Sequence, residues 1–390
     1  MKFMLSQRPL SQILKTWRAQ CPSSPTHYPI PITWPPTFCR KLGTTPTDNT
    51  FVQSEYVGQT GRVYTVHQTL RSSRGYQSFL ATSDDGQKFH LKYLQPENLK
   101  RYQIINDRLK DSASHFRLLK DVIPSESMIV CEPYNTSFYR AIKHRDRLSP
   151  SMVKKILKSL LNVLAELHDR DVVYGVFSLR KILIDLTKDQ GQLTLSKVQL
   201  AHSVNTVYLP RGSNIVGRQI GPLEWRSPES AVLATVNKPS DIFSFALLFI
   251  FAVYKHAVLA KNIPVKNHVK PDKQISVLER QISYFADRKG LEGFLKYLGK
   301  DHPFVPMIEL IRDGFSEVNP PKPFSRWENV DEDFRSLILA MTNFDPSKRI
   351  TARQALEHKW FEDVEVVQQE DRPEVQEGNQ DSSLVSEVKQ

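Results

Sequence analysis

Residues 167–185 read LHDRDVVYGVFSLRKILID, and this stretch decides how the rest of the chain is interpreted. The apolar residues of 151–168 recur at helical spacing, which predicts an amphipathic helix that ends in Leu-His. A short β-branched segment follows, and Ile-Leu-Ile-Asp then has the composition of a buried strand. No Asp, Glu or Asn stands between Asp171 and Asp185. Residues 172–184, which hold most of the loop between helix and strand, therefore offer neither a carboxylate nor a carboxamide.

The segments on either side of this stretch differ in their predicted structure. Before it lie strand-like segments at 62–70, 76–83 and 88–94, a helical segment around 97–111, and two more strands at 117–123 and 127–134. After about residue 218 the pattern is mainly helical. Strands followed by helices predict an α+β fold with a small antiparallel-sheet part and a larger helical part.

The two ends of the chain have biased compositions. Residues 1–47 carry +6 with no acidic residue, residues 362–390 carry −7, and the net charge of the whole chain is +11. A basic, Ser-containing, acid-poor start is typical of a mitochondrial transit peptide. The alternative is an extension without a targeting role in a cytoplasmic protein. We expect the Pro-rich start and the acidic tail to be disordered, with a sheet-rich lobe at 48–134 and a helical lobe at 135–361.

Composition also limits the classes of partner. The residues between the two ends carry +12, but no aromatic RNA-binding motif or basic recognition helix accompanies this charge, so no nucleic-acid partner is expected. The longest apolar run, Ile242–Tyr254, is shorter than the roughly 20 residues that span a bilayer. We therefore expect a buried helix there and no membrane span. Three scattered cysteines suggest neither a disulfide framework nor a zinc cluster.

Three motifs in the second half, taken together, carry a family resemblance. They are Ser227-Pro228-Glu229 within EWRSPES, Asp241 within SDIFSFALL, and Arg349 within DPSKRITARQALEHKWF. In this order they resemble the A-P-E motif, the D-x-W-S-x-G helix start and the late arginine of protein kinases. By this resemblance the chain is identified as a member of the protein kinase superfamily over about 62–361. The run from LERQISYFADRKGLEGFL through KPFSRW to ALEHKWF also resembles a group of fungal kinase-like proteins. The resemblance implies a bilobal fold in which Glu229 and Arg349 form a buried structural ion pair.

The same resemblance makes the loop at 167–185 a degenerate catalytic loop. In the pattern H-R-D-L-x-x-x-N, the slots read Tyr174, Gly175, Val176 and Lys181. The D-F-G slot falls on His202-Ser203-Val204. The catalytic base and both magnesium ligands are thus missing, and magnesium needs oxygen ligands. We expect no catalytic residue and no metal site.

The first half keeps part of a nucleotide site. Lys92, in Phe89-His90-Leu91-Lys92, stands where V-A-I-K would place the phosphate-pairing lysine. The acid nearest the usual partner position on the following helix is Asp107, which is one methylene shorter than the usual Glu, so the usual ion pair is not expected. The hinge corresponds to Glu132-Pro133-Tyr134, so the Glu132 carbonyl and the Tyr134 N–H are the expected adenine contacts. The glycine-rich lid is degraded to RSSRGY at 71–76, which has side chains where phosphates would approach.

Two further matches are misleading. Gly58-Gln59-Thr60-Gly61 resembles a glycine-rich loop, but it lies too far before Lys92. His144-Arg145-Asp146 spells the catalytic motif, but it precedes the helix at 151–168 and no Asn follows at the required spacing. We assign no chemistry to either.

These observations predict a catalytically inactive protein-kinase-like protein, a pseudokinase, that acts through protein–protein interaction or scaffolding. One alternative is an atypical Ser/Thr-kinase-like enzyme, and another is a metal-independent nucleotide-binding switch. No cofactor is expected, and ATP bound without magnesium is the alternative. The partner proteins are not identified by the sequence, although the region Gly221–Trp225 corresponds to a peptide-docking surface of kinases.

Overall fold

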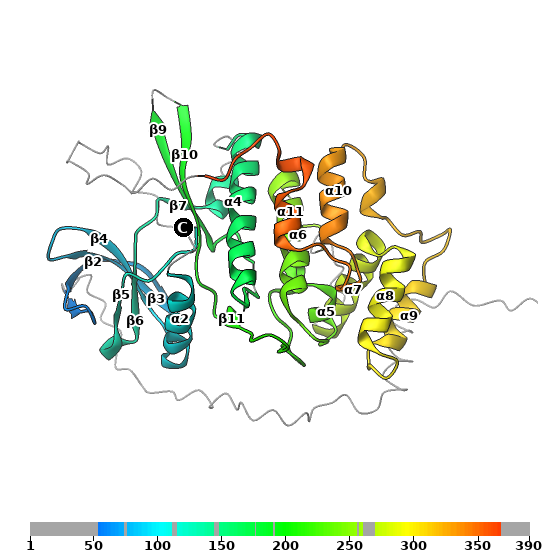
Figure 1. Cartoon of the computed structure of the whole chain (residues 1–390), viewed down its shortest axis with the longest axis horizontal. Coiled ribbons are helices and arrows are strands. Elements are labelled where there is room, and N and C mark those ends of the chain that lie inside the picture. Colours follow the sequence, from blue (N-terminus) through cyan, green and yellow to red (C-terminus); the bar gives the residue numbers. More distant parts are fainter. Residues whose placement is uncertain are drawn as a thin grey trace, which may run out of the picture.

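The computed structural model describes residues 54–367, except 74–75, 111–114, 144–147, 176, 190–191, 256 and 260–269. Within this part of the chain, an antiparallel sheet formed by the first half packs beside a helical second half (Figure 1). The α+β architecture expected from the sequence is confirmed. The expected extension at 1–47 and the tail beyond residue 367 lie outside the described residues.

The first half is a sheet of six strands with one helix. Strand order is β1-β2-β3-β4-β6-β5, and every neighbouring pair is antiparallel. The strands are β1 (Glu55–Val57), β2 (Val63–Ser73), β3 (Tyr76–Ser83), β4 (Lys88–Tyr93), β5 (Asp121–Ile123) and β6 (Met128–Cys131). Helix α2 (Pro96–Leu109) buries Tyr102, Ile105 and Leu109, which recur at helical spacing on one face.

The second half is built around two long helices. Helix α4 (Pro150–Asp169) buries one apolar face, whereas α6 (Lys238–Tyr254) is apolar on all sides and almost fully buried. The remaining helices of this half are α3 (Phe138–Lys143), α5 (Pro228–Ala231), α7 (Lys270–Phe285), α8 (Arg288–Leu298), α9 (Val305–Asp313), α10 (Glu332–Met341) and α11 (Ala352–Leu356). None of the helices in the described part has the length and apolar composition needed to cross a membrane.

Two smaller sheets are formed by segments that lie in the sequence between the six-stranded sheet and α5. Strands β9 (Ile182–Asp189) and β10 (Gln192–Leu200) form a hairpin that β7 (Thr136–Ser137) joins, and β8 (Val172–Val173) pairs with β11 (Val207–Tyr208). At the end of β10, Leu200 exchanges backbone hydrogen bonds with the segment before β5: its N–H donates to His115 O at 2.8 Å and its carbonyl accepts from Arg117 N at 3.0 Å.

The segment 362–367, which we call the strap, runs from the helical half back towards the sheet (Figure 1). Its residue Val367 donates from its backbone N–H to Ser159 Oγ on α4 at 3.0 Å. The Val367 carbonyl lies 2.6 Å from the His115 ring Nε2 in the first half.

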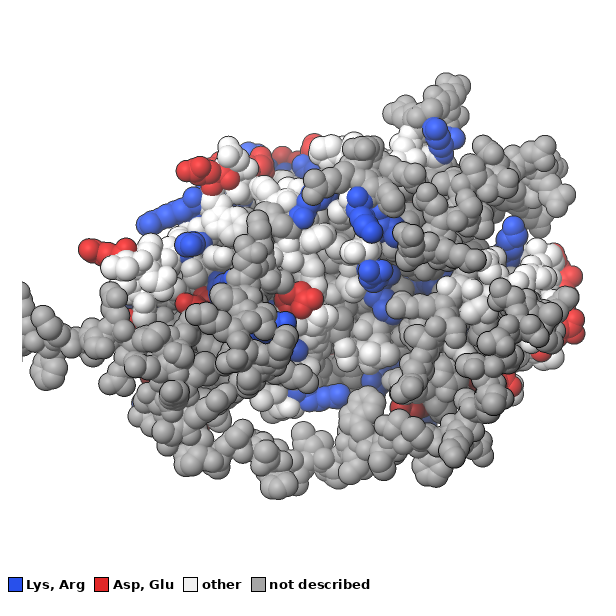
Figure 2. All heavy atoms as spheres, turned by 180° about the vertical axis from the view of Figure 1, so that it is seen from behind, with Lys and Arg blue, Asp and Glu red and all other residues white. Residues whose placement is uncertain are grey.

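Seen from behind the view of Figure 1, Lys and Arg side chains are spread across the middle of the molecule (Figure 2).

Of the two misleading motif matches, the structure describes only the one at Gly58–Gly61. Gly58–Gly61 forms a turn fastened to β5, because Thr60 N–H donates to Asp121 Oδ1 at 3.2 Å and Tyr64 OH donates to Asp121 Oδ2 at 3.0 Å. This turn is structural. The second match, at 144–146, lies outside the described residues.

Candidate functional site

Tyr174, in the first slot of the degenerate catalytic loop, is a core residue. Its ring is fully buried and packs against Phe177 with ring centres 4.8 Å apart. Its hydroxyl donates to Ala201 O at 2.8 Å. Burial raises the pKa of the Tyr174 hydroxyl well above its usual value. The Tyr174 side chain is therefore part of the core beneath the loop, and its hydroxyl is not available to a substrate.

Asp241, at the start of α6, holds the loop by its backbone. Its Oδ2 accepts from Tyr174 N–H at 2.7 Å, and its Oδ1 accepts from Gly175 N–H at 2.8 Å. His168 Nε2 lies 3.1 Å from the same Oδ2. A buried carboxylate is stabilised by donors of this kind, and the first helical turn adds the favourable end of the helix dipole.

Gly175 occupies a position that a side chain would not tolerate. Its φ is +78°, and an added Cβ would approach Asn205 O to 2.8 Å. The loop is therefore fitted to glycine at this slot. The next slot, Val176, lies outside the described residues.

Lys181 and His202, in the two slots where kinases hold magnesium, lie next to each other. Lys181 Nζ donates to the backbone carbonyl of His202 at 3.1 Å. The His202 ring is stacked on Tyr102 of α2 at 4.4 Å and meets Phe116 edge-on at 4.5 Å between ring centres. The structure thus brings these two predicted slots together and fills them with a cation and an imidazole.

Lys92 faces the same place from β4. Its Nζ lies 5.5 Å from the centre of the Tyr102 ring, and the side chain is buried. Asp107, the acid nearest the usual partner position on the following helix, is exposed on α2. The inner face of α2 is formed by Tyr102, Ile105 and Leu109, and Asp107 lies outside that face.

The hinge is occupied by side chains of the protein itself. The carbonyl of Glu132, expected to contact adenine, accepts a hydrogen bond from the guanidinium of Arg117. The same guanidinium reaches His90 Nδ1 at 3.0 Å and lies 5.0 Å from the centre of the Tyr134 ring. The Glu132 carboxylate is turned outwards to Lys120 and Lys197, each at 2.6 Å. Tyr134 is partly exposed and meets His90 edge-on.

A small cavity remains between these groups. Its volume is about 60 Å³. Pockets that bind drug-sized ligands have volumes of about 300–1,000 Å³. The side chains and backbone that line it are those of His90, Lys92, Tyr102, Arg117, Ile129, Cys131, Tyr134, Arg180, Lys181, Leu183, Ala201 and His202. Among these described lining residues, none is an Asp or a Glu.

The positive charge around the cavity changes the protonation of its basic groups. Burial, with the nearby Lys181 ammonium, lowers the pKa of Lys92 to about 7. Burial and Arg117 lower the pKa of His90 to about 3, and burial and Lys92 lower the pKa of His202 well below its usual value. Both imidazoles are therefore neutral at physiological pH.

These residues do not fit a magnesium–nucleotide complex. Magnesium takes oxygen ligands, mainly carboxylates, and Lys181 and His202 offer none. Across residues 54–367, outside the gaps named above, no group of three or more His, Cys, Asp or Glu side chains is arranged to hold a metal ion. The cleft has the location of a kinase active site and a different chemical lining.

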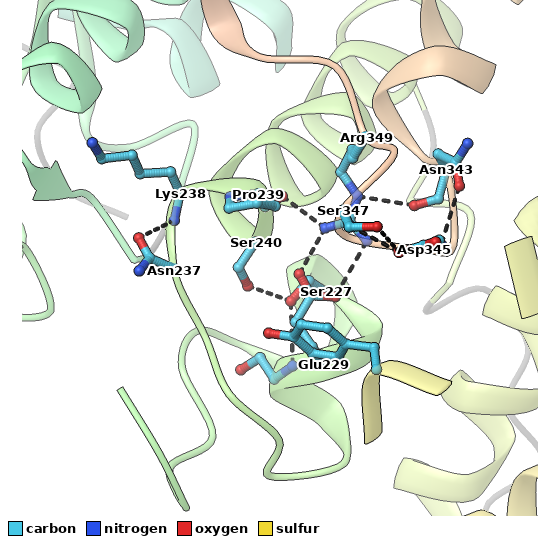
Figure 3. A network of polar contacts seen from close by, with 12 residues as sticks. Ser227, Glu229, Asn237, Lys238, Pro239, Ser240, Asn343, Asp345, Ser347 and Arg349 are labelled. Carbon is cyan, nitrogen blue, oxygen red and sulfur yellow. Dashed lines mark hydrogen bonds and ion pairs between the residues drawn. The ribbon is translucent and has the colours of Figure 1, made fainter. Parts of the chain in front are cut away.

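Glu229 and Arg349 form the ion pair that the sequence predicts. Arg349 reaches from the loop before α11 to Glu229 in α5 (Figure 3). Its Nη1 lies 2.6 Å from Glu229 Oε1 and its Nη2 lies 3.3 Å from Oε2. The remaining donors bond to Pro239 O at 2.7 Å and Asn343 O at 3.0 Å. Both side chains are almost completely buried, so this pair joins α5, α6 and the loop that follows α10 within the helical half.

Sequence reasoning missed three residues of the site: His90, Tyr102 and Arg117. His90 carried a visible signal, because it stands in the alanine position of V-A-I-K, where a small side chain leaves room for a ligand. Helical spacing with Ile105 and Leu109 indicates that Tyr102 faces inwards. Arg117 gave no signal that distinguishes it from a surface residue before a strand.

The comparisons with known proteins agree with this geometry. The protein kinase domain matches the chain over residues 58–361. A relative described as serine/threonine-protein kinase srb10, from Schizosaccharomyces pombe, is 24% identical over 217 residues, which are 55% of this chain. The chain spans 57% of the length of that relative. Because the domain match includes both the sheet and the helical half, we conclude that the chain belongs to the protein kinase family.

Proposed function

We propose that the protein is a catalytically inactive member of the protein kinase family that acts by binding other proteins. The observation that carries this proposal is the lining of the cleft, where the Lys181 ammonium and the neutral His202 imidazole stand in the two described slots that normally hold magnesium ligands. Phosphoryl transfer depends on magnesium to neutralise the terminal phosphates and on an Asp to orient the hydroxyl. Lys181 donates to the His202 backbone instead.

Support for a binding role comes from what the helical half retains. The segment Gly221–Trp225, where kinases dock peptides, is held in place because the Arg226 guanidinium donates to Gly221 O at 2.7 and 3.2 Å. Ile220 N–H donates to Ser230 Oγ at 2.7 Å beside it. A defined surface beside a non-catalytic cleft suits recognition of a protein without modification of it.

Nucleotide binding without magnesium is the second candidate, and the hinge argues against it. Arg117 occupies the Glu132 carbonyl that adenine would need, and His90 fills the adjacent space. A nucleotide would have to displace this buried guanidinium. We therefore expect the melting temperature of the protein to be unchanged by ATP at equal ionic strength, with or without magnesium.

A phosphorylation assay tests the inactive assignment. We expect no magnesium-dependent transfer of the γ-phosphate of ATP to a Ser/Thr peptide library, to general protein substrates or to the chain itself. Lys92→Ala is the matched control for contaminating kinases, because the wild type and this variant should give the same background. Ser/Thr phosphorylation by the wild type that Lys92→Ala abolishes would overturn the proposal in favour of an atypical Ser/Thr kinase.

Partial restoration of the site sharpens the same test. Restoring one group should give no activity, because residues that act as a unit are strongly non-additive. The smallest set worth making is Val176→Asp with Lys181→Asn and His202→Asp. We expect this triple variant to remain inactive as well, since Gly175 stays in the adjacent slot and Arg117 still blocks the hinge.

We further propose that the protein is mitochondrial, on the basis of the basic, acid-free composition of residues 1–47. These residues fused to a fluorescent reporter should direct it to mitochondria. A wholly cytosolic reporter would contradict the targeting proposal without affecting the assignment of the fold.

A further inference from the structure

We propose that the cavity between Lys92, Lys181 and His202 is a binding site for a free, small tetrahedral oxyanion, of which inorganic phosphate and sulfate are the simplest members. The site lies where a kinase would hold the magnesium-bound phosphates of ATP, but it is built for an anion without a metal and without a nucleoside.

Charge is the first argument. Lys92 and Arg117 are 8% and 7% exposed, and both line the cavity together with Lys181. The nearest carboxylate described at the hinge, that of Glu132, is turned to Lys120 and Lys197. Like charges held close together in a partly buried space repel one another more strongly than in water. A bound dianion would remove this repulsion and attract each cation.

Unsatisfied hydrogen-bonding groups are the second, independent argument. His202 is 5% exposed, and within the described residues neither of its ring nitrogens has a hydrogen-bond partner. Arg117 Nε is likewise without a partner in the described part of the chain. Buried polar groups nearly always have partners, so a missing one indicates a bound water or ligand. A neutral imidazole supplies one N–H donor, and the lysines beside it supply more.

Size selects a free ion over a nucleotide. A single water needs roughly 10–15 Å³ of such space, so a cavity of about 60 Å³ holds a few waters or one small anion. The route towards the hinge is closed by the contact of Arg117 with His90 and Glu132. An adenosine group attached to the phosphate therefore has no place to lie.

Binding should also take up a proton. The Lys92 ammonium is disfavoured by burial and by Lys181, and its pKa is about 7. A dianion beside it favours the charged form and raises this pKa. Above pH 7, where a fraction of the free protein has neutral Lys92, anion binding and protonation of Lys92 are therefore coupled.

Thermal unfolding and calorimetry of the full chain test this inference. At pH 7 and constant ionic strength, the melting temperature should rise with the concentration of inorganic phosphate or sulfate and not with chloride, because a ligand that binds only the folded state stabilises it. Lys92→Met and Lys181→Met should each weaken phosphate binding at least tenfold. Lys296→Met, which removes an exposed lysine of α8, should leave it unchanged.

Two sources of phosphate are separated by comparing ligands at equal concentration. Inorganic phosphate should bind more tightly than AMP or magnesium-free ATP. Tighter binding of either nucleotide would overturn the free-ion proposal. Equal phosphate affinity for the wild type, Lys92→Met and Lys181→Met would overturn the site itself.

If Lys92→Met does not unfold cooperatively, the phosphate affinity of Lys181→Met and the proton uptake at pH 8 test the site in its place. That uptake is measured from the binding enthalpies of the wild type in two buffers of different ionisation enthalpy. The absence of proton uptake would contradict the role of Lys92. These binding results are independent of the phosphorylation assay.

Discussion

The buried charges of the helical half and those of the cleft are arranged in opposite ways. In the helical half, Arg349 meets Glu229 through two hydrogen bonds, and Asp241 accepts from two backbone donors. In the cleft, Lys92, Lys181 and Arg117 surround one cavity whose described lining contains no acid. The buried charges that support the fold have an opposite charge or hydrogen-bond donors as partners, whereas the groups that would hold a metal have been replaced. The fold therefore does not require the chemistry of the cleft.

Removing the guanidinium of the paired region should have the largest effect. In Arg349→Ala, the Glu229 carboxylate is left buried without its partner, so the free energy of unfolding should fall by about 3–5 kcal/mol. Denaturant titration followed by circular dichroism measures it. Arg353→Ala is the matched control, because Arg353 pairs with Asp169 at the surface and exposed pairs contribute at most about 1 kcal/mol. Equal losses for the two variants would show that the Glu229–Arg349 pair is not the structural support described above.

Neutralising Asp241 should have the next largest effect. Asp241→Asn keeps the size of the side chain but replaces one accepting oxygen by a donor facing a backbone N–H. A hydrogen bond to a charged group is worth about 1.5–3 kcal/mol, and we expect a loss of unfolding free energy in that range. Asp169→Asn, a surface change, is the control. A neutral result for Asp241→Asn would mean that the loop at Tyr174 is held by its apolar packing alone.

The cleft predicts that the stability of the protein depends on pH. Lys92 has a pKa of 10.5 when unfolded and about 7 when folded, so between these values the unfolded chain binds more protons. The stability contributed by this side chain therefore rises from pH 7 to 10.5, and below pH 7 its destabilising effect is complete. Lys92→Met removes the effect. In phosphate-free buffer, the stability advantage of Lys92→Met over the wild type should shrink by about 1 kcal/mol per pH unit between pH 7.5 and 9.

The pH dependence measured for Lys92→Met also depends on whether the groups around Lys92 titrate in the same range. Lys181, Arg117 and neutral His202 face it across the cavity, and Cys131 and Tyr102 lie against it. Burial raises the pKa of the Cys131 thiol, which keeps it neutral in this range. The difference between Lys296→Met and the wild type should be flat with pH. A flat difference for Lys92→Met as well would mean that Lys92 remains charged throughout the range.

The sequence predicted the architecture well because its signals were local or occurred in a fixed order. The amphipathic pattern at 151–168 gave α4 to within a residue at each end. The motifs around Glu229, Asp241 and Arg349 fixed the order of the helical half, and the Glu229–Arg349 contact follows from that order. The strand expected at 117–123 was too long, since only 121–123 is paired as a strand.

The cleft was predicted less completely, because its lining comes from side chains that reach across from unrelated segments. The missing carboxylates were visible in the sequence. The closure of the hinge was not, because it depends on the direction of the Arg117 side chain towards His90 and the Glu132 carbonyl. The sequence argued against Asp107 as a partner of Lys92 from the length of its side chain. The structure adds a second reason, because the helical face of α2 puts Tyr102 inside and Asp107 outside.

The strap affects how readily the two lobes on either side of the cleft can separate. Enzymes of this family open and close their two lobes to exchange nucleotide, on a timescale of microseconds to milliseconds. Here, wider opening has to separate the Val367 carbonyl from the His115 ring while Ser159 holds the same residue on α4. The strap thus bridges the two lobes. Any exchange that needs the lobes to separate further should therefore be slower with the strap in place than without it.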